Sequence, residues 1–276
     1  MDLYNAVSRE LSRHLTLRYS SSFGLSSRLF SRAIRSDIYA VYGLVRIADE
    51  IVDTYTGSDK QQLLDDLETE TTAAIARGYS TNPIVHAFSQ TAGRYGIDKA
   101  LIEPFFASMR MDIHPETYTQ ADYQTYIYGS AEVIGLMCLR VFCAGDTARY
   151  ETLTPGACAL GAAYQKVNFL RDIAADHHEL GRMYFPDVQY DTFSDEDKHA
   201  ISADIGADFA AAQSSLAQLP RSSKAAVMLS VMYYRRLLRR LERTSVDDIK
   251  TSRLRIGTPR KLWLLLITVV RYRVLS

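Results

Sequence analysis

The chain has 276 residues, of which 47% are hydrophobic and 23% are charged, and its formal net charge at pH 7 is zero. This composition is typical of a folded globular protein with a full core and excludes a disordered chain. The charge is uneven, because the segment from Arg235 onward carries 12 basic and 3 acidic residues, a local balance of +9. Such a segment suits nucleic acid, anionic lipid or diphosphate and by itself selects none of them.

The cysteines and the apolar segments indicate the cellular compartment to expect. The three cysteines, Cys138, Cys143 and Cys158, form no C-x-x-C pair and lie in apolar surroundings, which is typical of reduced thiols. The N-terminus lacks the basic start and apolar core of a signal peptide. The longest strongly apolar run, Leu262–Val270, is shorter than the roughly 20 residues that a bilayer-spanning helix needs. We therefore expect a cytoplasmic protein without a transmembrane helix.

Helical periodicity dominates the chain from its N-terminal part onward. Apolar residues recur every three or four positions over 38–52 and again over 163–174, and strand-like alternation is rare. Cap and turn residues predict where the helices end, namely at Gly78, Asn82-Pro83, Gly96 to Asp98, His114-Pro115, Gly145-Asp146, Pro155-Gly156, Gly181 and Ser194. No linker, repeat or low-complexity tract interrupts the pattern. We predict an all-α bundle of roughly eight or more helices that forms a single domain over 1–276.

The first helix with unusual polar residues spans the positions around 42–53. Tyr42, Arg46, Asp49 and Asp53 are spaced by 4, 3 and 4 residues, so a helix places them on one face between apolar neighbours. An isolated D-x-x-x-D pair most often belongs to a solvated helix face, where the repulsion of the two charges costs only about 0.2–0.5 kcal/mol.

The second such helix repeats this design further along the chain. Gln165, Asn168, Asp172 and Asp176 are spaced by 3, 4 and 4 residues, again between apolar positions. If both helices lie in the core, four carboxylates converge where ionised acids are unfavourable without cations. We therefore expect a positively charged ligand between them.

Magnesium with a diphosphate fits this pattern best. Mg²⁺ takes one or two carboxylates and completes its octahedron with water and substrate phosphate oxygens. Arg46, Arg171 and Arg182 supply positive charge for the diphosphate, although each alone is more often a salt-bridge residue. A di-iron bundle needs two Glu-x-x-His pairs, and the sequence has only Glu196 with His199. Glycine-rich nucleotide-binding motifs are absent as well.

The two aspartate stripes resemble the motifs of a known family, the squalene/phytoene synthases. The segments 46–53 and 165–176 read RIADEIVD and QKVNFLRDIAAD, and the second is followed by GRMYFP at 181–186. Weaker similarities are SSSF at 20–23, MD at 111–112, YGSAEVIG at 128–135, and Arg255 with Lys261. The resemblance extends from about Tyr19 to Leu262 and is closest to the bacterial phytoene synthases.

This resemblance implies an isoprenoid-synthase fold in which the two motifs face each other across a central cavity. It also implies a prenyltransferase that joins two prenyl diphosphates head to head, first to a cyclopropylcarbinyl diphosphate and then, after a second ionisation, to the hydrocarbon. We expect two C20 geranylgeranyl diphosphates and the product phytoene, as in carotenoid biosynthesis. The alternatives are a squalene or dehydrosqualene synthase acting on C15 farnesyl diphosphate, and a scaffold protein of this fold, which tends to lose the motif aspartates.

The resemblance also assigns roles to individual residues. The cofactor implied is Mg²⁺, with Mn²⁺ as a substitute and without NADPH, and its ligands are Asp49, Asp53, Asp172, Asp176 and Asn168. Tyr42 and Tyr234 would lie near the carbocation. The implied substrate contacts are Ser20, Ser22, Phe23, Arg46, Gln165, Asn168, Arg171, Arg182 and Tyr184, with Gly129 and Val133 as cavity wall or, equally, as close helix contacts. Some relatives carry lysine at the position of Ser21, so a phosphate contact there is not expected.

The C-terminal segment completes the sequence-based expectations. Its apolar run over 262–267, flanked by Arg260, Lys261, Arg271 and Arg273, favours a core helix and, as the alternative, peripheral contact with the inner face of a membrane. We expect prenyl diphosphates as partners and no nucleic acid, and the sequence identifies no protein partner.

Overall fold

The structure is a computed structural model that describes residues 1–113, 118–251, 254, 256–270 and 272. The part of the chain that it describes contains helices and connections and no strand, so the predicted all-α class is confirmed. The elements are α1 Asp2–Tyr19, α2 Ser21–Ser27, α3 Arg32–Asp49, η1 Glu50–Thr54, α4 Lys60–Arg77, α5 Pro83–Tyr95, α6 Lys99–Met111, α7 Gln120–Ile127, η2 Tyr128–Glu132, α8 Val133–Cys143, α9 Thr147–Leu180, α10 Asp195–Ala211, α11 Gln213–Gln218, α12 Arg221–Glu242, α13 Val246–Thr251 and α14 Thr258–Val269.

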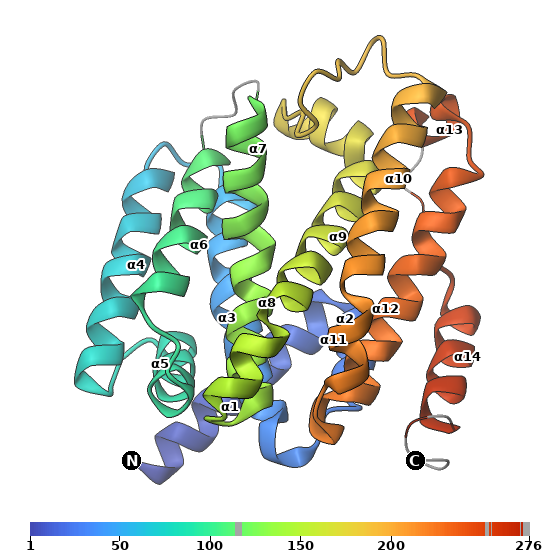
Figure 1. Cartoon of the computed structure of the whole chain (residues 1–276). Coiled ribbons are helices and arrows are strands. Elements are labelled where there is room, and N and C mark those ends of the chain that lie inside the picture. Colours follow the sequence, from blue (N-terminus) through green and yellow to red (C-terminus); the bar gives the residue numbers. More distant parts are fainter. Residues whose placement is uncertain (114–117, 252–253, 255, 271, 273–276) are drawn as a thin grey trace.

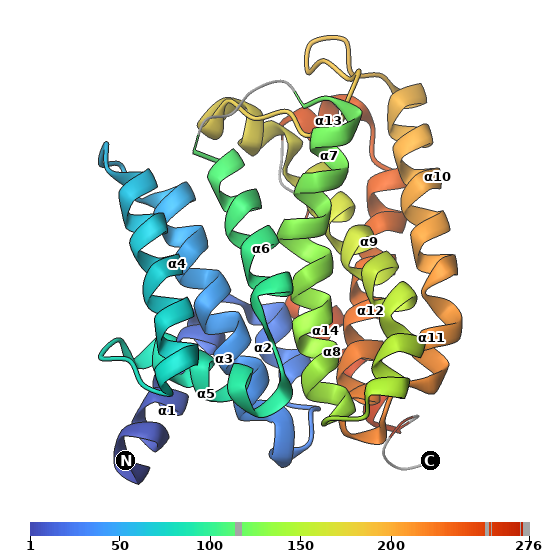
Figure 2. The same cartoon turned by 60° about the vertical axis from the view of Figure 1, so that its left-hand side comes forward.

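The helices form two groups on either side of a central helical column. Helices α3 to α6 lie on one side and α9 to α12 on the other, with α7, η2 and α8 running between them (Figures 1 and 2). Helix α8 contacts α3, α6 and α9, and α14 packs against α12 and α2. Helix α9 has 34 residues and is therefore about 50 Å long, so one element crosses the whole bundle.

Local capping chemistry explains several helix ends. Asn82 accepts hydrogen bonds from the first turn of α5, and Ser194 forms a capping box with Asp197 at the start of α10. Gly96 and Gly181 end α5 and α9 in the left-handed conformation, with φ of 68° and 66°. These ends were predicted from the sequence.

One predicted break is wrong, and another lies outside the described residues. Pro155 and Gly156 lie inside α9 rather than at a helix end. A Cβ on Gly156 would stand 2.2 Å from the Cβ of Ser215, so this glycine allows α11 to pack directly on α9. Tertiary packing therefore overrides the local breaker signal. The predicted turn at 114–115 falls on residues that the structure does not describe.

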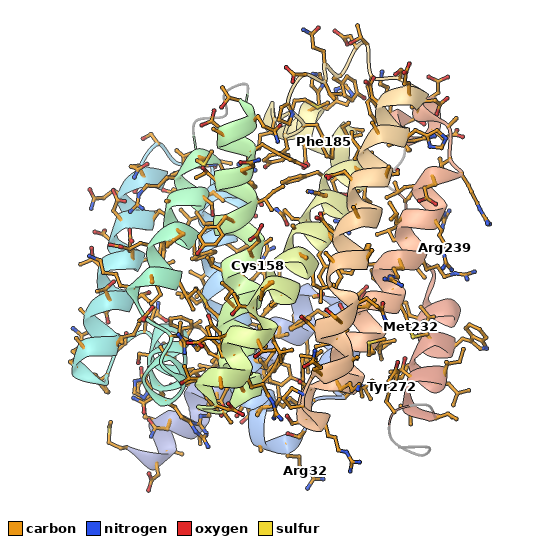
Figure 3. The ribbon with its side chains drawn as sticks, viewed as in Figure 1. Arg32, Cys158, Phe185, Met232, Arg239 and Tyr272 are labelled. Atoms are coloured by element: carbon orange, nitrogen blue, oxygen red, sulfur yellow. The ribbon has the colours of Figure 1, made fainter. Side chains whose placement is uncertain are left out.

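Buried apolar side chains form two large clusters, one around α3, α5, α6 and α8 and one around α7, α9, α10 and α12. Figure 3 shows Phe185, a member of the second cluster, inside the upper end of the bundle. The continuous helical stretch Gln120–Cys143 is long and apolar enough to cross a bilayer, but 56% of its most apolar window is buried in the bundle. A core helix passes the same test, so the stretch is weak evidence for a membrane segment.

Candidate active site

The first aspartate motif lies where α3 changes into a π-helical turn. Asp49 is the last residue of α3, and Asp53 lies in η1, whose end is marked by the hydrogen bond from the Tyr55 N–H to the Glu50 carbonyl at 2.9 Å. Such wide turns recur at functional sites because they redirect side chains within a helix. The predicted helical face is thus present, although its last position belongs to a wider turn.

Arg46 is paired within its own motif. Its guanidinium hydrogen-bonds Glu50, lies 3.8 Å from Asp49 and stacks over the Tyr19 ring, with its Cζ 4.4 Å from the ring centroid. Its Nε is buried without a hydrogen-bond partner. The side chain therefore presents one unsatisfied donor beside the first motif.

The second aspartate motif occupies the C-terminal third of α9. Arg171 donates two hydrogen bonds to the neighbouring Asp172 carboxylate, and the Tyr234 hydroxyl donates to Asn168 Oδ1 at 3.3 Å. Gln165 lies one turn earlier on α9 and is half-buried. The predicted stripe from 165 to 176 is therefore a single helix face.

The carboxylates of the two motifs belong to one electrostatic cluster. Burial, together with the neighbouring charge of Asp53, raises the pKa of Asp49 to about 7. Burial and the charge of Asp172 raise the pKa of Asp176 to about 7, and Asp53 and Asp112 contribute in the same direction. The charge of Asp53 in the first motif thus raises the pKa of Asp176 in the second, so the carboxylates of the two motifs face a common space.

Arg182 links this cluster to a buried carboxylate on α6. Its Nη1 donates to Asp53 Oδ1 at 2.7 Å, and its Nη2 donates to the Asp112 carbonyl oxygen at 2.7 Å. The Tyr184 hydroxyl donates to Asp112 Oδ1 at 3.0 Å, and the Tyr126 hydroxyl donates to Oδ2 at 2.7 Å. Tyr184, predicted as a substrate contact, is therefore buried in this network.

A cavity of about 330 Å³ lies below the carboxylates. Its wall is almost entirely apolar and is supplied by α2, α3, η2, α8, α9, α11, α12 and α14. Phe30 and Phe142, whose ring centroids are 5.4 Å apart, belong to this wall. The volume is within the range of small-molecule sites, and the lining suits a hydrocarbon chain.

The cavity continues the same helix faces that carry the aspartates. On α9, Ala157, Gly161 and Tyr164 line the cavity, and Asn168, Asp172 and Asp176 follow on that face. On α3, Ile38 lines the cavity and is followed by Tyr42, Arg46 and Asp49. The apolar cavity therefore lies along the same faces of α3 and α9 that carry the aspartates further along each helix.

Aromatic side chains mark the boundary between the two parts. Tyr42 stacks on Phe23 with centroids 5.2 Å apart, and Tyr234 stacks on Tyr164 with centroids 4.0 Å apart. A hydrogen bond links Tyr42 to Ser20, and burial raises the pKa of Tyr42 to about 12, so its hydroxyl stays protonated at neutral pH. The rings of Tyr42 and Tyr234 thus lie between the acidic cluster and the apolar cavity.

Several predicted contact residues of α2 lie at the cavity. Ser20, Ser22 and Phe23 line it, and Ser20 also caps α2 by accepting a hydrogen bond from the Phe23 N–H. Lys261 of α14 lines the cavity too and donates to the Ser21 hydroxyl at 2.9 Å. A cation from α14 therefore reaches Ser21, between the predicted contacts Ser20 and Ser22.

Gly129 and Val133, predicted as cavity wall or as close helix contacts, are not among the residues that line the cavity. A Cβ on Gly129 would stand 2.2 Å from the Pro104 carbonyl oxygen, so this glycine permits close packing of η2 on α6. Val133 is fully buried in the core. Their neighbours Ser130, Ala131, Ile134 and Gly135 line the cavity instead, because they lie on the opposite face of the same helix. The helix-packing alternative therefore holds.

Sequence reasoning missed three contributors to this region, namely Asp112, Tyr126 and Tyr233. Asp112 and Tyr126 belong to the Arg182 network, and Tyr233 lines the cavity beneath Lys261. The Met111-Asp112 pair was noted as a weak motif match. Its spacing did not predict the hydrogen bonds of Asp112 to residues of α7 and of the segment after α9. Arg255 lies outside the described residues.

The donor set fits magnesium held together with a phosphate ligand. Among the residues that the structure describes, no three His, Cys, Asp or Glu side chains converge closely enough to hold a metal on their own. Mg²⁺ requires only one or two carboxylates per ion when phosphate oxygens and water complete its shell. Asp49 and Asp53 keep 33% and 41% of their side-chain surface exposed and are accessible to such a ligand.

Comparison with known proteins agrees with this geometry. The squalene/phytoene synthase family model matches residues 16–197, about two thirds of the chain. The chain belongs to the squalene/phytoene synthase family. Sequence relatives include a phytoene synthase from Arthrospira platensis, 28% identical and covering 97% of this chain and 94% of the relative, and a 15-cis-phytoene synthase from Pantoea ananas, 28% identical with coverages of 90% and 86%.

Solved structures of the family share the fold. A dehydrosqualene synthase in complex with a ligand superposes with a TM-score of 0.82 at 20% identity, covering 98% of both chains. A squalene synthase from Alicyclobacillus acidocaldarius gives a TM-score of 0.76 at 22% identity, covering 87% of this chain and 95% of that one. The protein is thus a prenyltransferase of isoprenoid-synthase fold, from a family that condenses prenyl diphosphates head to head.

Proposed function

We propose that the protein joins two geranylgeranyl diphosphates head to head, with Mg²⁺, to form phytoene. The observation that carries this proposal is the apolar cavity that lies along the same faces of α3 and α9 as the two aspartate motifs. An amphiphile with a prenyl tail and a diphosphate head matches the cavity and the aspartates. The choice of the C20 substrate rests on the relatives, several of which are phytoene synthases.

The residues have separate tasks in this proposal. Asp49, Asp53, Asp172 and Asp176, with Asn168, would hold Mg²⁺, which would stabilise the charge that develops on the departing diphosphate. Arg46, Arg171 and Arg182 would contact the diphosphate, and Gln165 would lie beside it. The apolar wall would exclude water from the carbocation, and Tyr42 and Tyr234 would place aromatic rings next to it.

Product analysis tests this function directly. The purified protein is incubated with geranylgeranyl or farnesyl diphosphate, with Mg²⁺, Mn²⁺ or EDTA, and with or without NADPH. We expect diphosphate release that depends on the divalent ion and a C40 hydrocarbon from the C20 substrate without NADPH. A C30 product from farnesyl diphosphate alone would instead support the squalene or dehydrosqualene alternative. Release that persists in EDTA would contradict the metal assignment.

We also propose that the enzyme contacts a membrane surface through α14. Leu264 and Thr268 of this helix are buried, whereas Trp263, Leu266 and Val270 are exposed on its outer face. Arg239 extends outward from α12 on the side of the molecule where α14 lies (Figure 3). An apolar stripe beside cations is suited to an interface with anionic lipid, into which a hydrocarbon product must pass. Arg260, Arg271 and Arg273 are not among the described side chains.

A further inference from the structure

A fifth carboxylate lies at the point where the two motifs meet, outside both of them. Asp112 is the C-cap residue of α6, and only 4% of its side-chain surface is exposed. Its Oδ2 accepts the Tyr126 hydroxyl, its Oδ1 accepts the Tyr184 hydroxyl, and the Arg182 Nε lies 3.5 Å from Oδ1. Both oxygens therefore already have partners from the protein, so the carboxylate has little room to serve as a metal ligand.

The same residue fixes the guanidinium of Arg182. Nη2 donates a hydrogen bond to the Asp112 carbonyl oxygen, and Nε lies 3.5 Å from the Asp112 carboxylate as an ion pair without a hydrogen bond, so one residue contacts two sides of the planar group. The remaining side places Nη1 at 2.7 Å from Asp53. A free arginine side chain has many rotamers, and these contacts order the Arg182 side chain before a ligand binds.

These contacts connect the two motifs through one buried anchor. Arg182 lies two residues after the end of α9, Asp53 ends the first motif, and Asp112 is the C-cap residue of α6. Arg182 itself is 4% exposed, so the connection lies beneath the open part of the site. Displacement of Arg182 would change the position of the Asp53 carboxylate relative to the carboxylates of α9.

We propose that Asp112 is a positioning residue, which sets the affinity of the site for a magnesium diphosphate by holding Arg182 against Asp53. The proposal rests on the proposed function, because it assigns Asp112 a task within that site. It acts only through Arg182. Removal of the Asp112 charge therefore has no effect of its own once Arg182 is changed.

A double-mutant cycle tests this dependence. Titration calorimetry measures the affinity for inorganic diphosphate in the presence of Mg²⁺ for the wild type, Asp112→Asn, Arg182→Gln and the double variant. We expect each single change to weaken binding about 10- to 100-fold, the range seen when a partner of a metal ligand is lost, and the double variant to bind like Arg182→Gln. Multiplied effects in the double variant would overturn the proposal and indicate independent ligation by Asp112.

A matched control separates positioning from general damage to the fold. Asp37 is also a buried aspartate, 1% exposed, which accepts hydrogen bonds from Thr91 and Tyr95 and lies 3.8 Å from Arg94, but it lies between α3 and α5 away from the site. Asp37→Asn should lower the melting temperature and leave the diphosphate affinity within about twofold of wild type. An equal loss of affinity in Asp37→Asn and Asp112→Asn would contradict a positioning role.

A gentler variant keeps the test valid if Asp112→Asn does not fold. Tyr126→Phe removes one donor to Asp112 and leaves both charges in place, so we expect a smaller loss of affinity that again disappears in the Arg182→Gln background. An unchanged affinity in Tyr126→Phe, or a loss that persists in the Arg182→Gln background, would overturn the proposal. Failure of the wild type to release diphosphate from either prenyl substrate would instead overturn the proposed function, which is a separate result.

Discussion

The four motif aspartates differ in their neighbours, and these differences determine how readily each carboxyl group ionises. Asp172 is hydrogen-bonded by Arg171 and Asp53 by Arg182, whereas Asp49 and Asp176 carry raised pKa values of about 7. Without a cation, the last two carboxylates therefore resist ionisation. A divalent ion removes that resistance, which is the physical reason to regard these four residues as one binding site.

Removing a single motif charge should abolish turnover and spare the fold. For Asp49→Asn and Asp172→Asn we expect diphosphate release to fall more than about tenfold, because each change removes a charge that would stabilise the metal ions. Far-ultraviolet circular dichroism should remain at the wild-type level. Asp66→Asn, on the exposed surface of α4, is the control and should keep full activity. More than a tenth of wild-type activity in either motif variant would contradict the metal assignment.

The raised pKa of Asp176 also predicts how the metal-free protein responds to pH. The carboxyl group titrates near 4 when unfolded and at about 7 when folded, so its protonated form favours the native state. Its contribution to stability is complete below about pH 4 and is lost as the pH rises through 7. In EDTA, the free energy of unfolding of Asp176→Asn should therefore increase relative to wild type between pH 5 and pH 8.

Urea unfolding at several pH values provides this measurement, and Asp66→Asn should follow the wild type throughout. A difference between Asp176→Asn and wild type that is independent of pH would show that the carboxyl group does not titrate in this range.

At the scale of helices, the described structure depends on close approaches at small residues. Gly156 of α9 faces Ser215 of α11, and Gly129 of η2 faces the Pro104 carbonyl of α6. The first approach also lies at the cavity, because Gly156 and Ser215 both line it. The width of the cavity is therefore set partly by how closely α11 can pack on α9.

Two glycine substitutions in helices should have opposite effects on stability. Gly156→Ala should lower the free energy of unfolding by about 1–3 kcal/mol, because the new methyl group meets the Ser215 Cβ and α11 must move. Gly206→Ala in α10 has no atom within 4 Å of the added Cβ and should raise stability by about 0.4–1 kcal/mol. Equal changes in urea unfolding would contradict the inferred contact between α9 and α11.

Local sequence patterns predicted the helices and the faces that carry the motifs. They did not predict contacts between residues that are distant in the sequence. Asn82, Ser194 and Gly181 act on backbone groups within a few positions, so the sequence alone reveals their effect. The Asp112 hydrogen bonds reach Tyr126, Arg182 and Tyr184, which are 14, 70 and 72 positions away. Only the fold brings those partners together. The same reason explains why the sequence left open whether Gly129 lines the cavity or packs closely against another helix, as it does against α6.

At the scale of the whole molecule, the apolar cavity and the exposed apolar side chains of α14 lie on opposite sides of the same helix. Lys261 and Leu264 line the cavity, while Trp263 and Leu266 of the same helix face outward, with 59% and 60% of their surface exposed. One helix therefore separates the cavity from the surface that we propose to meet lipid. A product without a polar head would leave the protein by the shortest apolar route across this helix.

Vesicle flotation tests the membrane surface. The wild type should float with anionic liposomes at low salt, bind neutral liposomes less and be released as the ionic strength rises, because attraction to anionic headgroups is screened. Changing Trp263 and Leu266 together to Gln should abolish flotation. The control variant changes Leu3 and Leu11 to Gln. These two leucines are exposed on α1 at the other side of the bundle, so this variant should float normally. Flotation that survives the α14 changes would exclude this surface.

The position of α14 has a consequence for the order in which the protein matures. The aspartate motifs and most of the apolar wall come from residues before 235, whereas Lys261 and Leu264 belong to α14, which packs against α2 near the start of the sequence. During synthesis, the cavity therefore stays open along one side until α14 has left the ribosome and docked. A reactive carbocation would need a closed wall, so we expect catalytic competence only once α14 has docked, after the helices that carry the aspartates have formed.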